Sequence, residues 1–395
     1  MCPFNRRESV RSQEEPSLRR ARLFRAVLIA LFLLAVAILA GIHFLRPALT
    51  SGGLTGKFMN AVAVPSPDGG FRLWILSDGS FHYVSRVESP GRLSIARKCK
   101  FCKTWTSVYD PTTKTVLAKF KTDYQSVIIQ SWMAYENGKI WIATDAYENN
   151  EPQLFVYSPE PAGLVRETVD IVGTYPELGS GLIKVRMEKD PDRLILDTKD
   201  GRVGLVLVLG DEKIYESESE LKKAMASGDE ERTTLFALSQ EGGGPRKILF
   251  KVTGPRGKLK DSSLEFLLTN PQSLMSWSRA TAERVAPGSV FIEGVIFHQD
   301  PDGCLVLHQD AAGKAANRLL TCLDANGNEK WTADQAELFQ EMKVDLDKDP
   351  LSNIVFMKGN LDVSLSGSLV LLQLKGVGLI GFDFATGQKL WEIRL

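Results

Sequence analysis

The sequence has few of the residues on which common hydrolytic and redox sites depend. Its 395 residues include four His and five Cys, and no HExxH, GxSxG, P-loop or Rossmann glycine pattern occurs among them. Few general bases are therefore available for catalysis. No Asn lies in an Asn-x-Ser/Thr acceptor pattern, which favours a bacterial periplasm over a glycosylating secretory pathway.

The sequence also lacks an excess of either charge. Lys and Arg together number 48, as do Asp and Glu, so the formal net charge is zero. Residues 1–25 hold seven Arg and three Glu, a local charge of +4, and the remainder therefore carries −4. A mildly acidic body argues against nucleic acid as a partner.

One long hydrophobic run is present. Residues 26–45 contain no formally charged residue, and Arg22 and Arg25 precede them while Arg46 follows. As a helix this run spans roughly 30 Å, the thickness of a bilayer's hydrocarbon core. We expect an uncleaved anchor with its Arg-rich end in the cytoplasm. A cleaved signal peptide is the alternative, but its apolar region is only about 7 to 15 residues long.

These features divide the chain into four parts. Residues 1–21 are expected to form a disordered cytoplasmic tail, residues 22–46 a transmembrane anchor helix and residues 47–56 a flexible linker rich in Gly, Ser and Thr. Residues 57–395 would then be a periplasmic domain. The expected location is the bacterial inner membrane, crossed once through residues 26–45.

From residue 57 onward the pattern is that of short alternating strands separated by Pro-Asp-Gly, Asn-Gly and Asp-Gly turns. Five groups of strands can be distinguished, at 60–120, 128–169, 182–252, 290–332 and 353–395. A unit of four short strands that recurs in this way along the chain is typical of a β-propeller. Because residues 201–234 and 258–287 do not fit the pattern and include helix-like segments at 217–226 and 271–284, we allow five to seven blades. An array of two-sheet sandwiches is the alternative fold.

The clearest repeat is a hairpin that ends in Trp. In the C-terminal copy the defining residues are Asp383, Thr386, Gly387 and Trp391. An upstream copy has them as Asp324, Gly327 and Trp331, with one residue deleted. These hairpins resemble the repeat of the quinoprotein-type propeller family, which includes quinone-dependent dehydrogenases and a non-enzymatic lipoprotein that assists outer-membrane barrel assembly.

The resemblance implies a propeller fold in which each Trp docks between adjacent blades. Quinone-dependent members of that family are similar to one another in having adjacent cysteines over the cofactor. Here the nearest equivalent is Cys99 and Cys102, which are separated by two residues. The chain therefore resembles the non-enzymatic members more closely, and we predict no cofactor, no metal and no catalytic residue.

The cysteines are candidates for disulfides. Cys2 would be cytoplasmic or membrane-proximal, which leaves four cysteines in the exported part. We expect a local structural bridge or bulge at Cys99 and Cys102, with redox exchange and metal binding as alternatives. If the strands at 304–308 and 318–322 pair about a loop centred on Gly313, Cys304 faces Cys322 within reach of a cross-strand disulfide.

A duplicated His-Gln-Asp triplet at 298–300 and 308–310 would place His298 opposite His308. Two His alone leave a zinc shell incomplete, so exposed strand positions are the favoured interpretation.

These observations together predict a membrane-anchored extracytoplasmic propeller that acts as a scaffold for an envelope protein partner. A propeller enzyme is the alternative, either a quinone-dependent dehydrogenase or a hydrolase or lyase acting on a small envelope substrate.

Overall fold

The computed structural model describes most of the chain from residue 53 onward. The described residues are 29, 31–34, 53–89, 92–100, 102–123, 128–146, 151–179, 181–188, 192–226, 232–240, 244–255, 280–285, 288–300, 303–313, 316–334, 337, 361–374 and 377–394. Of residues 81–89 and 92–100 only the backbone is described.

The chain divides into two units, residues 1–50 and residues 51–395. In the first unit, Ile29 and residues 31–34 are helical and exposed. The predicted anchor at 22–46 otherwise lies outside the described residues and stays a prediction. Within the described part of the chain, no helix has the length and apolar character needed to cross a membrane.

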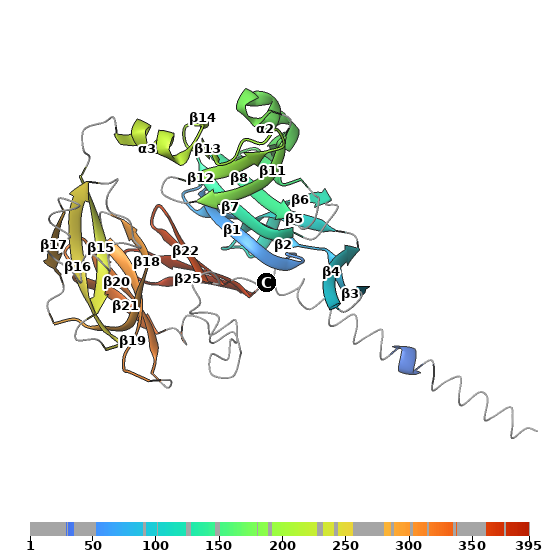
Figure 1. Ribbon diagram of the computed structural model, residues 1–395. Helices are drawn as coiled ribbons and strands as arrows, with labels where there is room; N and C mark the ends of the chain where they lie inside the picture. Colours follow the sequence, from blue (N-terminus) through green and yellow to red (C-terminus); the bar gives the residue numbers. More distant parts are fainter. Residues whose placement is uncertain are drawn as a thin grey trace, which may run out of the picture. The chain divides into compact units, whose positions relative to one another are not determined.

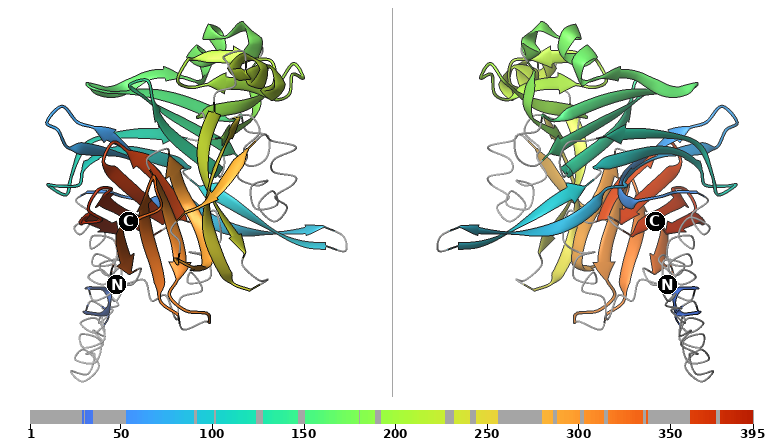
Figure 2. Two further views of the ribbon diagram at one scale, coloured as in Figure 1. Left: turned by 90° about the vertical axis from the view of Figure 1, so that its left-hand side faces the viewer. Right: turned by 90° about the vertical axis from the view of Figure 1, so that its right-hand side faces the viewer.

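The second unit consists almost entirely of antiparallel sheets (Figure 1). Sheet I has the order β1-β2-β5-β6, formed by Lys57–Pro65, Phe71–Asp78, Lys103–Asp110 and Thr115–Asp123. Between β2 and β5 the chain forms a separate two-stranded ribbon of β3 (Phe81–Ser89) and β4 (Arg92–Lys100), which Figure 2 shows in two further views.

Sheets II and III are the next two four-stranded sheets along the chain. Sheet II contains β7 (Ile128–Glu136), β8 (Lys139–Ala146), β9 (Gln153–Pro159) and β10 (Ala162–Glu167). Sheet III contains β11 (Leu182–Glu188), β12 (Arg193–Thr198), β13 (Leu205–Val208) and β14 (Lys213–Tyr215). The connection between these sheets includes α2 (Thr168–Thr174) and the 3-10 turn η1 (Pro176–Leu178), and α3 (Glu218–Ala226) follows sheet III.

Sheets IV and V complete the unit. Sheet IV has seven strands, β15 (Arg232–Gln240), β16 (Arg246–Pro255), β17 (Thr281–Arg284), β18 (Phe291–Asp300), β19 (Gly303–Gln309), β20 (Arg318–Asp324) and β21 (Glu329–Asp334). Its β15–β16 hairpin pairs with β18 at Arg246 and Lys247, which lie opposite Ile292 and Phe291. Sheet V contains β22 (Leu361–Ser366), β23 (Leu369–Leu374), β24 (Gly378–Asp383) and β25 (Lys389–Arg394).

Burial along the strands shows that the sheets are covered on both faces. Every residue of β13 and β23 is buried, as expected for an inner strand with apolar neighbours on each side. The outer strands β6 and β10 instead contain no buried residue. β13 and β23 are therefore buried along their whole length, whereas β6 and β10 are not.

Shared apolar clusters give the order in which the sheets pack. Sheet IV packs on sheet V through Leu305 and Val370, and sheet V packs on sheet I through Leu371 and Leu73. Further clusters join sheet I to sheet II and sheet II to sheet III. The C-terminal sheet thus lies beside the N-terminal one, and the packing order is IV–V–I–II–III (Figures 1 and 2).

The predicted strand groups at 60–120 and 128–169 are confirmed as sheets I and II. The predicted group at 182–252 is wrong. Sheet III ends with β14 at Lys213–Tyr215, and the hairpin at 235–252 belongs to sheet IV. The helix at 217–226 is confirmed as α3. The helix expected at 271–284 is wrong where it is described, since Thr281–Arg284 is strand β17.

Candidate functional site

The C-terminal hairpin turn is organised by one carboxylate. Oδ1 of Asp383 accepts hydrogen bonds of 2.8 Å from both the backbone N–H and the hydroxyl of Thr386. The Thr386 side chain and then its backbone N–H hold the pKa of Asp383 below its ordinary value. Gly387 follows with φ of +70°, a conformation that L side chains rarely adopt. These three residues form a turn between β24 and β25 in which the Asp383 carboxylate is hydrogen-bonded within the turn itself.

The upstream hairpin has the same device. Oδ1 of Asp324 accepts from the backbone N–H groups of Asn326 and Asn328 at 2.8 and 2.9 Å, and Gly327 has φ of +80°. The Asn328 side chain is the main cause of the lowered pKa of Asp324. In sheet I, Asp110 forms an equivalent turn between β5 and β6 by accepting from Thr112 at 2.8 Å.

Trp331 joins two sheets. It lies on β21 of sheet IV, and its indole Nε1–H donates to the carbonyl oxygen of Phe384 in sheet V at 2.9 Å. A Cβ added at Gly387 would lie 2.5 Å from the Trp331 ring, so the ring rests on the glycine of the neighbouring turn. Trp391 is half-buried and packs instead over Gly381, which is directly opposite it on β24.

A second contact between sheets was not predicted. The backbone N–H of Ala61 in sheet I donates to Oε1 of Gln373 in sheet V at 2.9 Å, and Nε2 of Gln373 donates to the Ala61 carbonyl oxygen at 2.7 Å. Both residues are buried. The sequence signal was a single amide residue inside the apolar strand Leu369–Leu374.

Sheets II and III are joined by a charged cluster around Glu212. Its carboxylate forms ion pairs with Lys139 and, at 2.7 Å, with Arg166, while its carbonyl oxygen accepts a hydrogen bond of 3.0 Å from the Tyr175 hydroxyl. Burial alone would raise the pKa of Glu212, but the two cationic partners outweigh it and the pKa is lowered. The Arg166 guanidinium also lies over the Trp141 ring, 5.3 Å from its centroid.

The predicted Cys304–Cys322 disulfide is wrong. Cys304 pairs with Leu323 and Cys322 pairs with Leu305, one step from the expected register. The two sulfurs are thiols on opposite faces, Cys304 in the cluster with β15 and Cys322 in the cluster with sheet V. The sulfur of Cys102 is in a disulfide. The side chain of Cys99 lies outside the described residues, so its pairing with Cys102 stays a prediction.

The expected pairing of His298 with His308 is also wrong, since His298 lies opposite Leu305 and His308 opposite Leu319. His308 Nε2 is 2.9 Å from the Thr321 hydroxyl, and burial lowers the pKa of its imidazole. Among the residues that the structure describes, no three His, Cys, Asp or Glu side chains are grouped to hold a metal ion.

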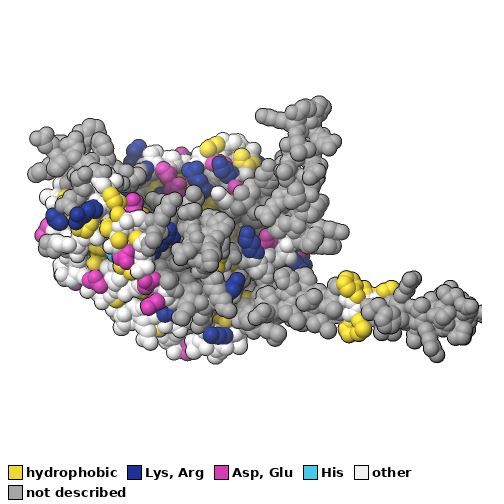
Figure 3. Space-filling model, turned by 90° about the horizontal axis from the view of Figure 1, so that it is seen from below, with side chains coloured by type: hydrophobic (Ala, Val, Ile, Leu, Met, Phe, Trp, Pro, Cys, Tyr) yellow, Lys and Arg dark blue, Asp and Glu magenta, His cyan; other side chains and the backbone are white. Residues whose placement is uncertain are grey.

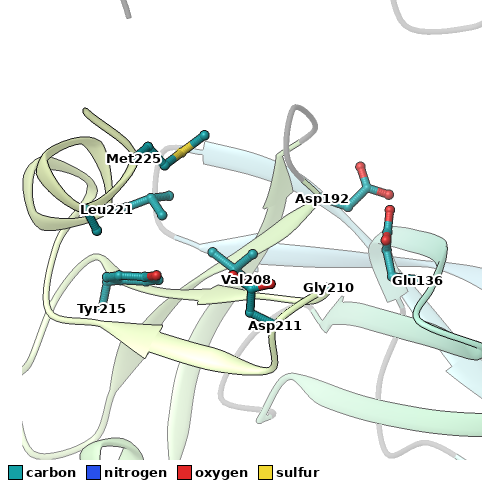
Figure 4. A pocket seen from close by; sticks show the side chains of 9 residues that line it. Glu136, Asp192, Val208, Gly210, Asp211, Tyr215, Leu221 and Met225 are labelled. Carbon is teal, nitrogen blue, oxygen red and sulfur yellow. The ribbon is translucent and has the colours of Figure 1, made fainter. Parts of the chain in front are cut away.

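A pocket of about 450 Å³ opens beside sheet III (Figure 4). Its lining comes from the end of β7, from the residue before β12, from the β13–β14 hairpin and from α3. The lining residues are Glu136, Asp192, Val208, Gly210, Asp211, Tyr215, Leu221, Ala224 and Met225. Burial, followed by the negative charge of Asp192, raises the pKa of Glu136. This pocket was not predictable from the sequence, because its residues come from four separate segments.

No protein-family model matches the sequence, and no curated protein matches it. Similar solved structures include the computationally designed Ika8 protein, with a TM-score of 0.21, 12% identity and coverage of 86% of this chain and 87% of that one. Another is dihydro-heme d1 dehydrogenase NirN in complex with DHE, with a TM-score of 0.22, 10% identity and coverage of 86% and 66%. At these TM-scores neither alignment carries an argument about fold or function.

Proposed function

We propose that the chain is a membrane-anchored, extracytoplasmic β-propeller of the quinoprotein type that serves as a scaffold for an envelope protein. The packing order of the five sheets supports a propeller, because the C-terminal sheet lies between sheet IV and the N-terminal sheet. The β15–β17 strands, which pack on β18–β20 through a separate cluster, would be a sixth, incomplete blade. The anchor is the apolar segment at 26–45.

The observation that carries a scaffold role is the character of the outer strands. β6, β10 and β25 are the last strands of their sheets, and each has at least one large apolar side chain about half exposed: Leu117 at 49%, Leu164 at 50% and Leu390 at 49%. A partner strand can pair with such an edge while its side chains cover the apolar residues. On the face shown in Figure 3, hydrophobic side chains lie among both cationic and anionic ones. Such a mixture is suited to contact with the surface of a partner protein.

Site-specific photo-crosslinking tests this role. A photoreactive amino acid replaces Leu117, Leu164 or Leu390 in the full-length chain expressed in a bacterial envelope. We expect one reproducible crosslinked protein from at least one of these positions. Val203, which is 74% exposed in the β12–β13 connection, provides the control. Equal crosslinking from Val203, or turnover of a small molecule by a purified chain that captures no protein, would overturn the scaffold role.

Membrane attachment has its own test. Replacing residues 1–50, the first unit, with a cleaved export signal should move the protein from the membrane fraction to the soluble periplasm. A full-length chain already found in the soluble fraction would remove the anchor from the proposal and leave the sheets unaffected.

A further inference from the structure

The pocket beside sheet III has two chemically different ends. At one end the carboxylates of Glu136 and Asp192 face each other, as Figure 4 shows, and Asp211 lies between this end and the rest. At the other end are the side chains of Tyr215, Leu221 and Met225. This arrangement suits a ligand that is cationic at one end and apolar at the other.

The acidic end favours a positive charge. Glu136 is half-buried and projects from sheet II, whereas Asp192 directly precedes β12 of sheet III, so the packing of two sheets brings the carboxylates together. Two partly desolvated anions repel each other, which is one of the causes that raise the pKa of Glu136. A bound cation placed between them relieves this repulsion and supplies charge-assisted hydrogen bonds.

The apolar end is shaped by the helix. Leu221 and Met225 are four residues apart on α3 and therefore lie on the same helix face. Leu221 is 5% exposed and packs against sheet III, while Met225 is 46% exposed at the rim. The Tyr215 ring carries the Lys213 ammonium at 4.8 Å from its centroid, so this resident cation is held at the ring. The walls suit an unbranched aliphatic chain.

We propose that this pocket binds an alkylammonium group, and that its source is a lysine side chain of the protein partner. The ammonium lies between Glu136 and Asp192, and the four methylene groups lie against Leu221 and Met225. A volume of about 450 Å³ leaves room for an apolar residue beside the lysine. The choice of a partner's lysine rests on the proposed scaffold function. A free amine is a second possible source of an alkylammonium group.

The methyl group of Met225 is a direct reporter of occupancy. The full-length chain is labelled with methyl-¹³C methionine in non-ionic detergent, and the Met225 resonance is assigned by its loss in Met225→Leu. n-Pentylamine is then titrated beside 1-pentanol, which has the same aliphatic chain without the charge. We expect a saturable shift of the Met225 resonance with pentylamine, and binding at least about tenfold weaker with pentanol.

Charge variants test the acidic end. The double variant Glu136→Gln, Asp192→Asn should weaken pentylamine binding by about tenfold or more. A matched double variant, Glu160→Gln with Glu283→Gln, also removes two negative charges, but from exposed positions outside the pocket, and should leave binding unchanged. Equal weakening by both double variants, or equal binding of pentylamine and pentanol, would overturn the site.

A peptide distinguishes the two sources of the amine. Ac-Leu-Lys-Leu-NH₂ should shift the Met225 resonance, and the same peptide with acetylated lysine should not. A chain that binds pentylamine but not the lysyl peptide would overturn a partner's lysine as the source and assign the pocket to a free amine. The crosslinking at the outer strands is measured independently, so failure of the pocket and failure of the scaffold role give different results.

Discussion

The side-chain amide of Gln373 forms hydrogen bonds with both backbone groups of Ala61, accepting from its N–H at 2.9 Å and donating to its carbonyl oxygen at 2.7 Å. The two residues are 312 positions apart and belong to the last and first sheets of the chain. One side chain therefore bonds to both backbone groups of a buried residue in another sheet, and it fixes the junction between sheets V and I. The Ala61 N–H also donates to Oδ1 of Asn60 at 2.9 Å.

Replacing Gln373 with Ala should destabilise the fold. The change leaves the carbonyl oxygen of Ala61 buried without this partner, at a cost of about 1–3 kcal/mol, whereas its N–H keeps Oδ1 of Asn60 as an acceptor at 2.9 Å. We expect a loss of about 1–3 kcal/mol in the free energy of unfolding, measured with chemical denaturant. Gln388→Ala, at an exposed position in the β24–β25 turn, is the control and should change stability little. Equal effects of the two substitutions would contradict this role.

The docking of Trp331 on Gly387 predicts a difference between two glycines. Gly387 and Gly69 have similar φ, +70° and +84°, so Gly→Ala at either site costs about 1–2 kcal/mol in backbone strain. Only at Gly387 does the added Cβ meet the indole, at 2.5 Å, whereas at Gly69 nothing lies within 4 Å. Gly387→Ala should therefore lower the free energy of unfolding by about 1–3 kcal/mol more than Gly69→Ala. Thermal unfolding of both variants measures the difference.

The local pattern of the sequence predicted most strands and turns. Alternation and turn residues located sheets I and II, and the Asp and Gly positions of the two Trp-bearing hairpins lie in equivalent turns. These features depend on residues close together in the chain. The contact between Gln373 and Ala61 depends instead on residues far apart in the chain. The local pattern of the sequence does not predict which backbone groups the Gln373 side chain will meet.

The cysteine pairing failed for a specific reason. A hairpin loop centred on Gly313 makes facing positions sum to 626, whereas the observed pairs, such as Gln309 with Arg318, sum to 627. A shift of one residue moves every side chain to the opposite face of the strand. The loop between these strands is long enough for either register, and burial of Cys304 and Cys322 in different clusters selects the observed one.

The Asp-based turns predict a loss of stability in acid. The folded-state pKa values of Asp324 and Asp383 lie below the ordinary aspartate value near 3.9. The stability that they contribute is therefore fully present above about pH 4 and is lost as the pH falls through their folded-state pKa values. The variant Asp324→Asn, Asp383→Asn should show a smaller decline in thermal midpoint between pH 5 and pH 3 than the unmodified chain. Glu283→Gln, on exposed β17, is the control, and an unchanged decline in the Asn variant would contradict the prediction.

The Glu212 cluster should couple sheets II and III energetically. The side chains of Arg166 and Glu212 are only 18% and 20% exposed, so their interaction is screened less by water and salt than a surface pair. A double-mutant cycle with Arg166→Met and Glu212→Gln should give a coupling free energy of about 0.5–3 kcal/mol that persists at high salt. The Arg72–Asp68 pair has nearly the same separation, 2.8 Å, but its carboxylate is 62% exposed. Its cycle should give a smaller coupling that salt removes, and equal coupling in the two cycles would show that the cluster adds nothing to the junction.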